Sequence, residues 1–127
     1  MIVIPANSEK FDEKICRKLF NKYRDVLDVD DFDTVLDTTH FFSFYDDNQK
    51  FIGCIYFYMH NDKLFITAYA GRGHHEINLE CLRESLGWYN CDIYAEKVQP
   101  AARLAILKCG FKKVGKDLYV YRRKNNG

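Results

Sequence analysis

The stretch from His40 to Ala70 constrains the fold more than any other part of the chain, because it contains three consecutive strand-like segments. These are "HFFSFYD", "FIGCIYFYMH" and "LFITAYA", and the short polar turns "DNQK" and "NDK" separate them. Runs rich in aromatic and β-branched residues, bounded by turn residues, are typical of antiparallel strands that pair as neighbours. The sequence therefore predicts a sheet with a three-stranded meander at its centre.

The segment before the meander predicts one strand and one amphipathic helix. "MIVIPA" is a short apolar run that reads as a strand, and apolar residues recur at helical spacing over 9–27. Asn7 or Ser8 is the expected cap of this helix. The segment "DVDDFDTVLDTT", 28–39, contains too much aspartate for a long helix, and it predicts a loop with one short turn.

The segment after the meander predicts alternating helices and strands. The expected elements are a helix over 75–88 that stops at Gly87, a strand over 91–98, a helix from Pro100 to Gly110, a hairpin or one bent strand over 111–123, and a frayed tail over 124–127. Proline at the first helical position and glycine just after the last are common helix boundaries. Helices that alternate with strands indicate an α/β (α+β) fold around one mixed sheet, and 127 residues predict a single domain.

Charge is balanced overall but uneven along the chain. The net charge of +1 argues against a strong preference for nucleic acid or for an anionic membrane. Residues 1–62 carry 12 acidic and 7 basic side chains, whereas residues 63–127 carry 6 acidic and 12 basic ones. A polyanionic ligand would favour the second half of the chain, and ordinary solvated faces explain the pattern equally well.

Five cysteines, at positions 16, 54, 81, 91 and 109, contain no C-x-x-C pair. They are expected to be reduced and buried rather than to form disulfides or a zinc site.

The start of the chain lacks the basic segment of a signal peptide, and the longest apolar stretch, 51–59, is too short to span a membrane. A cytoplasmic protein is therefore expected. "HHE" at 74–76 lacks the i, i+4 histidine pair of a helical zinc site, so no metal is predicted.

The segment "GRGHH", Gly71–His75, is the strongest candidate for a binding site. It lies directly after an apolar strand and directly before a helix. A glycine-rich turn at this point leaves backbone N–H groups at the positive end of the helix, which is an arrangement that binds phosphate. The alternative is a tight turn that needs glycine only for a positive φ.

Three segments together resemble the GCN5-related N-acetyltransferases, the GNAT superfamily. "DDNQKFIGCIYF" resembles the hairpin of that family, and "LFITAYAGRGHHEINLECL" resembles its central strand, pyrophosphate loop and following helix. "QPAARLAILKCGF" resembles the last helix of the family, with matching spacing at Gln99, Ala102, Ala105, Ile106, Gly110 and Phe111. The element order agrees as well, so the resemblance covers nearly the whole chain.

The resemblance implies a mixed, mostly antiparallel sheet with helices on both faces and a splayed central cleft. It also implies that acetyl-CoA lies in this cleft as co-substrate and that an amine or protein acceptor receives the acetyl group. The residues that it assigns to acetyl-CoA binding are Gly71, Arg72, Gly73, His74, His75 and Gln99. A homodimer is conceivable, because a splayed sheet exposes strand edges. Compact versions of this fold also resemble phage-encoded proteins, some of them virion components.

The chain departs from the family pattern at two positions. Ala68 stands where the phosphate loop usually has Gln or Arg, and Ile106 stands where a tyrosine often serves as general acid. No catalytic residue is therefore assigned. Glu96 is either a proton relay from the amine or a surface carboxylate. Three lysines either reach the ribose phosphate or form a solvated basic face: Lys112, Lys113 and Lys116.

Three functions remain open from the sequence. The first is an acyl-CoA-dependent N-acyltransferase. The second is a non-catalytic GNAT-fold protein with a structural, regulatory or virion role, and the third is a binding module of an unrelated α+β fold.

Overall fold

A computed structural model describes residues 1–27, 31–71, 73 and 75–123. The tail predicted to fray, 124–127, lies outside the described residues. In chain order the elements are β1 (Ile2–Pro5), α1 (Glu13–Leu27), α2 (Phe32–Thr38), β2 (His40–Tyr45), β3 (Phe51–His60), β4 (Lys63–Ala70), α3 (His75–Leu86), β5 (Ile93–Glu96), α4 (Pro100–Lys108), β6 (Lys112–Gly115) and β7 (Leu118–Tyr121).

All the strands form one sheet in the order β1-β2-β3-β4-β5-β7-β6. The predicted meander is confirmed, since β2, β3 and β4 pair as antiparallel neighbours. Only β4 and β5 pair in parallel among the described strands, because α3 carries the chain back between them. The last segment is a hairpin of β6 and β7 rather than one bent strand.

The first helix begins later than the sequence predicts. α1 begins at Glu13, and the carboxylate of Asp12 accepts a hydrogen bond from the backbone N–H of Ile15 at 3.3 Å. The hydroxyl of Ser8 accepts from the N–H of Lys10 within the preceding turn. The predicted start near residue 9, with Asn7 or Ser8 as the cap, is therefore wrong, because Asp12 sits at the capping position and Ser8 stabilises a turn.

A seven-residue helix, α2, occupies the segment predicted to be a loop. The carboxylate of Asp31 accepts from the N–H of Thr34 at 2.8 Å and caps the helix. Phe32 and Val35 are buried, and they anchor one side of the helix in the core. The loop prediction is wrong because one aspartate caps the helix while these two apolar residues pack beneath it.

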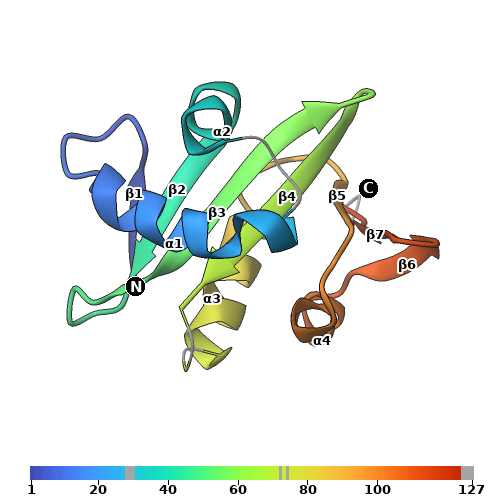
Figure 1. The fold of residues 1–127 in the computed structure, drawn as a ribbon. Coiled ribbons are helices and arrows are strands. Elements are labelled where there is room, and N and C mark those ends of the chain that lie inside the picture. Colours follow the sequence, from blue (N-terminus) through green and yellow to red (C-terminus); the bar gives the residue numbers. More distant parts are fainter. Residues whose placement is uncertain (28–30, 72, 74, 124–127) are drawn as a thin grey trace.

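Helices cover both faces of the sheet (Figure 1), as predicted. α1 and α2 pack on one face around a core cluster that includes Phe20, Phe32 and Tyr56. α3 packs on the opposite face around a larger cluster that includes Leu82 and Phe57. None of the helices within the described ranges is long and apolar enough to cross a membrane.

Four of the five cysteines belong to these cores, and all five are free thiols. Cys91 is exposed, so the prediction of burial is wrong at this position. It lies between α3 and β5, in a connection that runs over the surface.

Candidate functional site

The central strands β4 and β5 separate soon after they meet. Their pairing consists of Leu64 opposite Ile93 and Phe65 opposite Tyr94, whereas β4 pairs with β3 along its whole length. From Ile66 onward, one edge of β4 faces a cavity of about 450 Å3 instead of a neighbouring strand. The splayed central cleft predicted from the sequence is therefore present.

Two local features part the strands. At the end of β5, Lys97 adopts a left-handed backbone conformation with φ of 51°, and its N–H donates to the carbonyl of Asp117 at 3.0 Å. The chain is thereby turned toward the β6–β7 hairpin. At the other wall, Gly53 lets β3 approach so closely that a Cβ there would lie 2.4 Å from the carbonyl oxygen of Tyr69. The end of β4 thus stays on β3.

Small side chains leave the cleft open. β4 contributes Ala68 and Ala70, β5 contributes Ala95, and α4 contributes Ala102 and Ala105. Larger residues at these positions would fill the space between the parted strands, so the cavity is encoded by side-chain size as well as by backbone divergence.

The cleft has a different lining on each face of the sheet. On the α3 face the lining side chains from the sheet core are apolar and include Phe44, Ile66 and Leu82, and the start of α3 adds the polar His75 and Asn78. The lining residues on the α1 face carry aromatic and polar groups: Tyr23, Tyr58, Thr67, Tyr69 and Glu96. The cavity therefore extends through the gap in the sheet, from a mostly apolar side under α3 to a side with aromatic and polar groups under α1.

Of the residues described in the predicted phosphate loop, His75 lines the cleft and the two glycines do not. The N–H of Gly71 donates to the carbonyl of Ile52 at 3.0 Å. The β3–β4 pairing therefore continues to Gly71 and uses its N–H, while the assignment of Gly71 to acetyl-CoA binding stays a prediction. Gly73 has φ of 86°, and a Cβ built there would meet no described atom within 4 Å. Arg72 and His74 lie outside the described residues.

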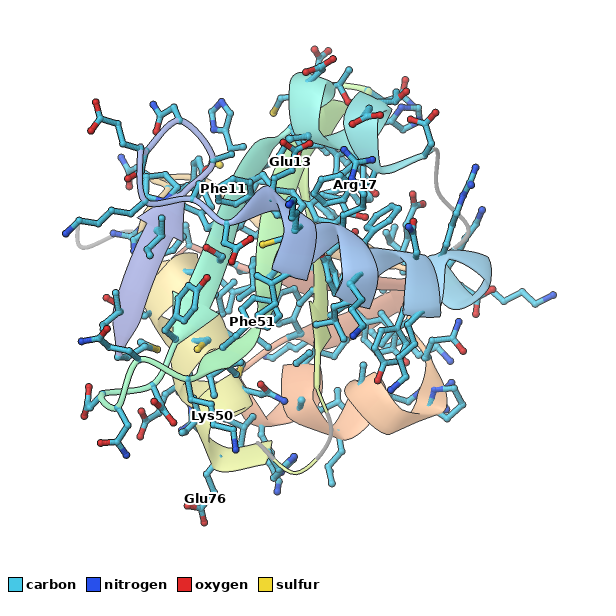
Figure 2. All side chains as sticks on the ribbon, turned by 60° about the vertical axis from the view of Figure 1, so that its left-hand side comes forward. Phe11, Glu13, Arg17, Lys50, Phe51 and Glu76 are labelled. Atoms are coloured by element: carbon cyan, nitrogen blue, oxygen red, sulfur yellow. The ribbon has the colours of Figure 1, made fainter. Side chains whose placement is uncertain are left out.

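The first turn of α3 supplies the polar groups nearest this loop. His75 begins the helix and lines the cleft, and Asn78 lines it one turn later. Backbone N–H groups in the first turn of a helix have no intrahelical partner, and they carry a partial positive charge. The carboxylate of Glu76, also in the first turn, projects away from the body of the molecule (Figure 2).

α4 closes the other side of the cleft, as its sequence pattern predicts. Gln99 is the N-cap residue and lines the cleft, and Pro100 occupies the first turn. Ile106 also lines the cleft and is buried. Gly110, with φ of 101°, follows the helix. The position that carries a tyrosine in the family pattern therefore faces the cleft with an aliphatic side chain.

Burial governs the ionisation of the two cleft tyrosines on the sheet. It raises the pKa of Tyr69, whose hydroxyl donates to the backbone carbonyl of Cys16 at 3.1 Å. Burial also raises the pKa of Tyr58, and the nearby carboxylate of Glu96 raises it further, whereas the neighbouring Thr67 lowers it. Both tyrosines are therefore protonated at neutral pH.

Other candidates from the sequence lie away from the cleft. Lys112 and Lys113 are exposed on β6, which is the outermost strand of the sheet, and Lys116 is exposed in the following turn. Within the part of the chain that the structure describes, no group of three or more His, Cys, Asp or Glu side chains could hold a metal ion.

Sequence reasoning named Glu96 but missed the other polar residues on the α1 face, together with Asn78. Tyr23, Tyr58 and Thr67 belong to no short motif. Tyr58 and Thr67 become neighbours through the strand register, which places Tyr56 opposite Thr67 and Tyr58 opposite Phe65. No spacing along the chain signals that arrangement.

No family model matches the chain, and no curated protein matches it in sequence. Solved structures do match it in fold. An acetyltransferase of the GNAT family from Staphylococcus aureus matches with a TM-score of 0.61 and 12% identity, covering 97% of this chain and 100% of that one. A chimeric spermidine N-acetyltransferase from Vibrio cholerae and hSSAT matches with a TM-score of 0.59 and 17% identity, covering 94% and 92%. The chain therefore has the fold of the GNAT acetyltransferases.

Proposed function

We propose that this protein is an acyl-CoA-dependent N-acyltransferase that transfers an acetyl group from acetyl-CoA to an amine. The observation that carries the proposal is the parting of β4 and β5 beside the first turn of α3. A strand edge without a neighbouring strand offers backbone N–H and C=O groups to an extended, amide-containing chain such as pantetheine. We take residues 1–127 as one domain, since a single sheet contains all the described strands.

The diphosphate of acetyl-CoA would bind at the start of α3. Gly73 offers open space on the side where a Cβ would stand, and the first-turn amides of α3 favour an anion. His75 and Asn78 are the side chains within reach, and Gln99 faces them across the cleft from α4. Arg72 and His74 stay predictions as additional ligands.

The amine would approach from the α1 face, where the polar lining lies. Its nitrogen attacks the thioester carbonyl carbon, and the bond from that carbon to sulfur breaks. Glu96 is the one carboxylate among the described lining residues, so it is our candidate for the base that takes the proton from the attacking nitrogen. The fold neighbours include a protein named a spermidine N-acetyltransferase, and spermidine is therefore the first acceptor to test.

Thermal unfolding with acetyl-CoA tests the proposal directly. Ligand at 100 times its dissociation constant stabilises a protein by about 2.7 kcal/mol. For a chain of this length, the melting temperature should rise by about 10 °C. An unchanged melting temperature at millimolar acetyl-CoA, CoA and longer acyl-CoAs would overturn the proposal.

Two variants, one that adds a negative charge and one that removes a negative charge, test where the diphosphate binds. Asn78→Asp adds a negative charge in the cleft one turn after the start of α3, so we expect it to weaken acetyl-CoA binding by about tenfold or more. Glu76→Gln removes a negative charge that is not among the cleft lining and projects away from the body of the molecule, so binding should be unchanged or stronger. Equal affinities for Asn78→Asp and the wild type would place the diphosphate elsewhere.

A GNAT-fold protein without acyl transfer is the second candidate. The aliphatic side chain of Ile106 in the cleft favours it, because a general acid is absent from that position. Titration of acetyl-CoA, combined with an assay for released thiol in the presence of spermidine, separates the two functions. Binding with no thiol release from any amine tested would favour the second.

A further inference from the structure

The cleft contains a tyrosine that can replace the missing proton donor of α4. We infer that Tyr58, which reaches the cleft from β3, protonates the departing thiolate during acyl transfer. The inference rests on the proposed function and assigns one catalytic residue to it.

Three tyrosines line the cleft, and the structure distinguishes them. The hydroxyl of Tyr69 is buried and donates to the carbonyl of Cys16 at 3.1 Å, where it ties β4 to α1. Tyr23 lies in the second half of α1, and its ring contacts the ammonium of Lys22 at 5.6 Å. Tyr58 alone of the three lies on a strand at the point where the sheet begins to part.

The strand register fixes this position. Tyr58 is opposite Phe65, and Phe65 is opposite Tyr94 in the last pair that joins β4 to β5. The ring of Tyr58 stacks on the ring of Phe65 with centroids 5.6 Å apart and planes 13° apart. The tyrosine is therefore held at the apex of the cleft, beside the first residues of the unpaired edge of β4.

The groups around its hydroxyl suit proton transfer. Thr67 of β4 and Glu96 of β5 both lie close enough to act on its pKa, which Glu96 raises and Thr67 lowers. Thr67 and Glu96 each stand two residues beyond the last β4–β5 pair, so their side chains project on the same face of the sheet as Phe65 and Tyr94. Lys97 is the nearby cation, and it opposes the effect of Glu96.

The proton balance of the step is complete with these groups. The amine enters as the free base, and it forms the new bond from nitrogen to carbon. Glu96 takes one proton from that nitrogen, while the thiolate that leaves takes the proton of the Tyr58 hydroxyl. The resulting tyrosinate then recovers a proton from the protonated Glu96. The products are the amide and the free thiol, and both side chains return to their starting state.

Tyr58→Phe is the direct test, with Tyr94→Phe as its matched control. We expect Tyr58→Phe to lower kcat for acetyl-CoA and spermidine by about 10²-fold or more, with little change in the acetyl-CoA dissociation constant. The ring of Tyr94 contacts Phe65 from the β5 side with centroids 5.8 Å apart, and Tyr94 is not a lining residue of the cleft. Its hydroxyl should therefore be dispensable.

A change of leaving group tests whether Tyr58 donates a proton or has only a structural role. An S-aryl thioacetate releases a thiol far more acidic than that of coenzyme A, so its departure needs no proton. Tyr58→Phe should therefore lose little activity with this donor. A second test adds Ile106→Tyr to Tyr58→Phe, which returns a hydroxyl to the α4 wall and should restore part of the lost rate.

Three outcomes would overturn the inference. They are an unchanged kcat in Tyr58→Phe, an equal loss with acetyl-CoA and with the aryl donor, and an equal loss in Tyr94→Phe. If the wild type binds acetyl-CoA and turns it over but one of these outcomes is found, Tyr58 is excluded while the proposed function stands. If the wild type does not bind acetyl-CoA, the proposed function fails, and the inference fails with it.

Discussion

Gly53, beside the cleft, allows β3 and β4 to approach closely because it has no side chain. A Cβ at this position would lie 2.4 Å from the carbonyl oxygen of Tyr69 and 2.7 Å from the Cα of Ala70. Both atoms belong to the backbone of β4, so neither can move without shifting the strand. The glycine between Ile52 and Cys54 is therefore required by the packing of β3 on β4.

We expect Gly53→Ala to destabilise the protein by about 1–3 kcal/mol, because the new methyl group forces the two strands apart. Gly87→Ala is the matched control. A Cβ at Gly87 would meet its nearest atom, the carbonyl oxygen of Glu84, at 3.4 Å. That substitution should change stability by less than about 0.5 kcal/mol. Urea unfolding of both variants measures the difference, and equal stabilities would contradict the packing argument.

Cys91 is the one thiol that reagents should reach quickly. It is exposed, whereas Cys16, Cys54, Cys81 and Cys109 are buried. Burial also raises the pKa of Cys81 to about 12, which keeps this thiol protonated and unreactive. A colorimetric thiol reagent should modify one cysteine rapidly in the native protein and all five after denaturation. Rapid modification in Cys91→Ser would show that a buried thiol is accessible.

Among the secondary-structure elements, α2 is a short helix that tertiary contacts stabilise. Seven residues are too few for a stable isolated helix. Here the guanidinium of Arg17 on α1 contacts both Glu13 and Asp33 with N–O distances of 2.6 Å, and it lies over the ring of Phe32. Figure 2 shows Glu13 and Arg17 on neighbouring turns of α1. Packing on α1 therefore holds α2 in place.

The Asp31 cap of α2 should make stability depend on pH. Hydrogen bonds from the backbone N–H and side chain of Thr34 lower the pKa of this carboxyl below its ordinary value of 3.8. Its contribution is complete above the ordinary pKa, and it is lost as the pH falls through the lowered one. Asp31→Asn keeps an acceptor oxygen but cannot be protonated in this range, so the melting temperatures of the two proteins should converge between pH 5 and pH 2. Parallel curves would contradict the assignment of the cap.

At the scale of the whole molecule, one sheet carries both the core and the site. Apart from β4 and β5, neighbouring strands pair over most of their length. The sheet therefore stays continuous although β4 and β5 separate after two residue pairs. The helices then cover different regions, with α1 and α3 on opposite faces of β3 and β4 and with α4 beside the gap (Figure 1). The cleft is therefore a property of the sheet rather than of one loop.

The unpaired edge of β4 should be visible by hydrogen exchange. Amides of residues 66–70 that point toward β5 lack a strand neighbour, so they should exchange faster than those that point toward β3. Acetyl-CoA should slow the exchange of this fast subset and leave β2 unchanged. Mass spectrometry with and without acetyl-CoA measures the effect. Equal protection of both subsets before the ligand is added would mean that the strand edge is already covered.

Local signals in the sequence predicted most of the fold. They failed where two residues could cap the same helix, and where a helix depends on contacts with residues distant in sequence. The meander, α3, α4 and the parted sheet follow from periodicity, helix boundaries and the family resemblance. The start of α1 was missed because Asp12 caps the helix in place of Ser8. The α2 segment was missed because the burial of Phe32 and Val35 depends on α1, which lies outside the local window.

The candidate site could also be predicted only in part from the sequence. The family resemblance of the last helix placed position 106 and Gln99 in the cleft, and both residues line it. The hydrogen bond from the N–H of Gly71 to Ile52 could not be predicted, since Ile52 lies on another strand.

By itself, the sequence determined the order of the elements, the glycines at the strand ends and the absence of a tyrosine hydroxyl at position 106. Each of these depends on residue type and on neighbours along the chain. Only the tertiary structure decided that Tyr58, Thr67 and Glu96 meet at the apex of the cleft. Their meeting depends on the register between strands and on the point where β5 leaves β4, and many separate contacts set both.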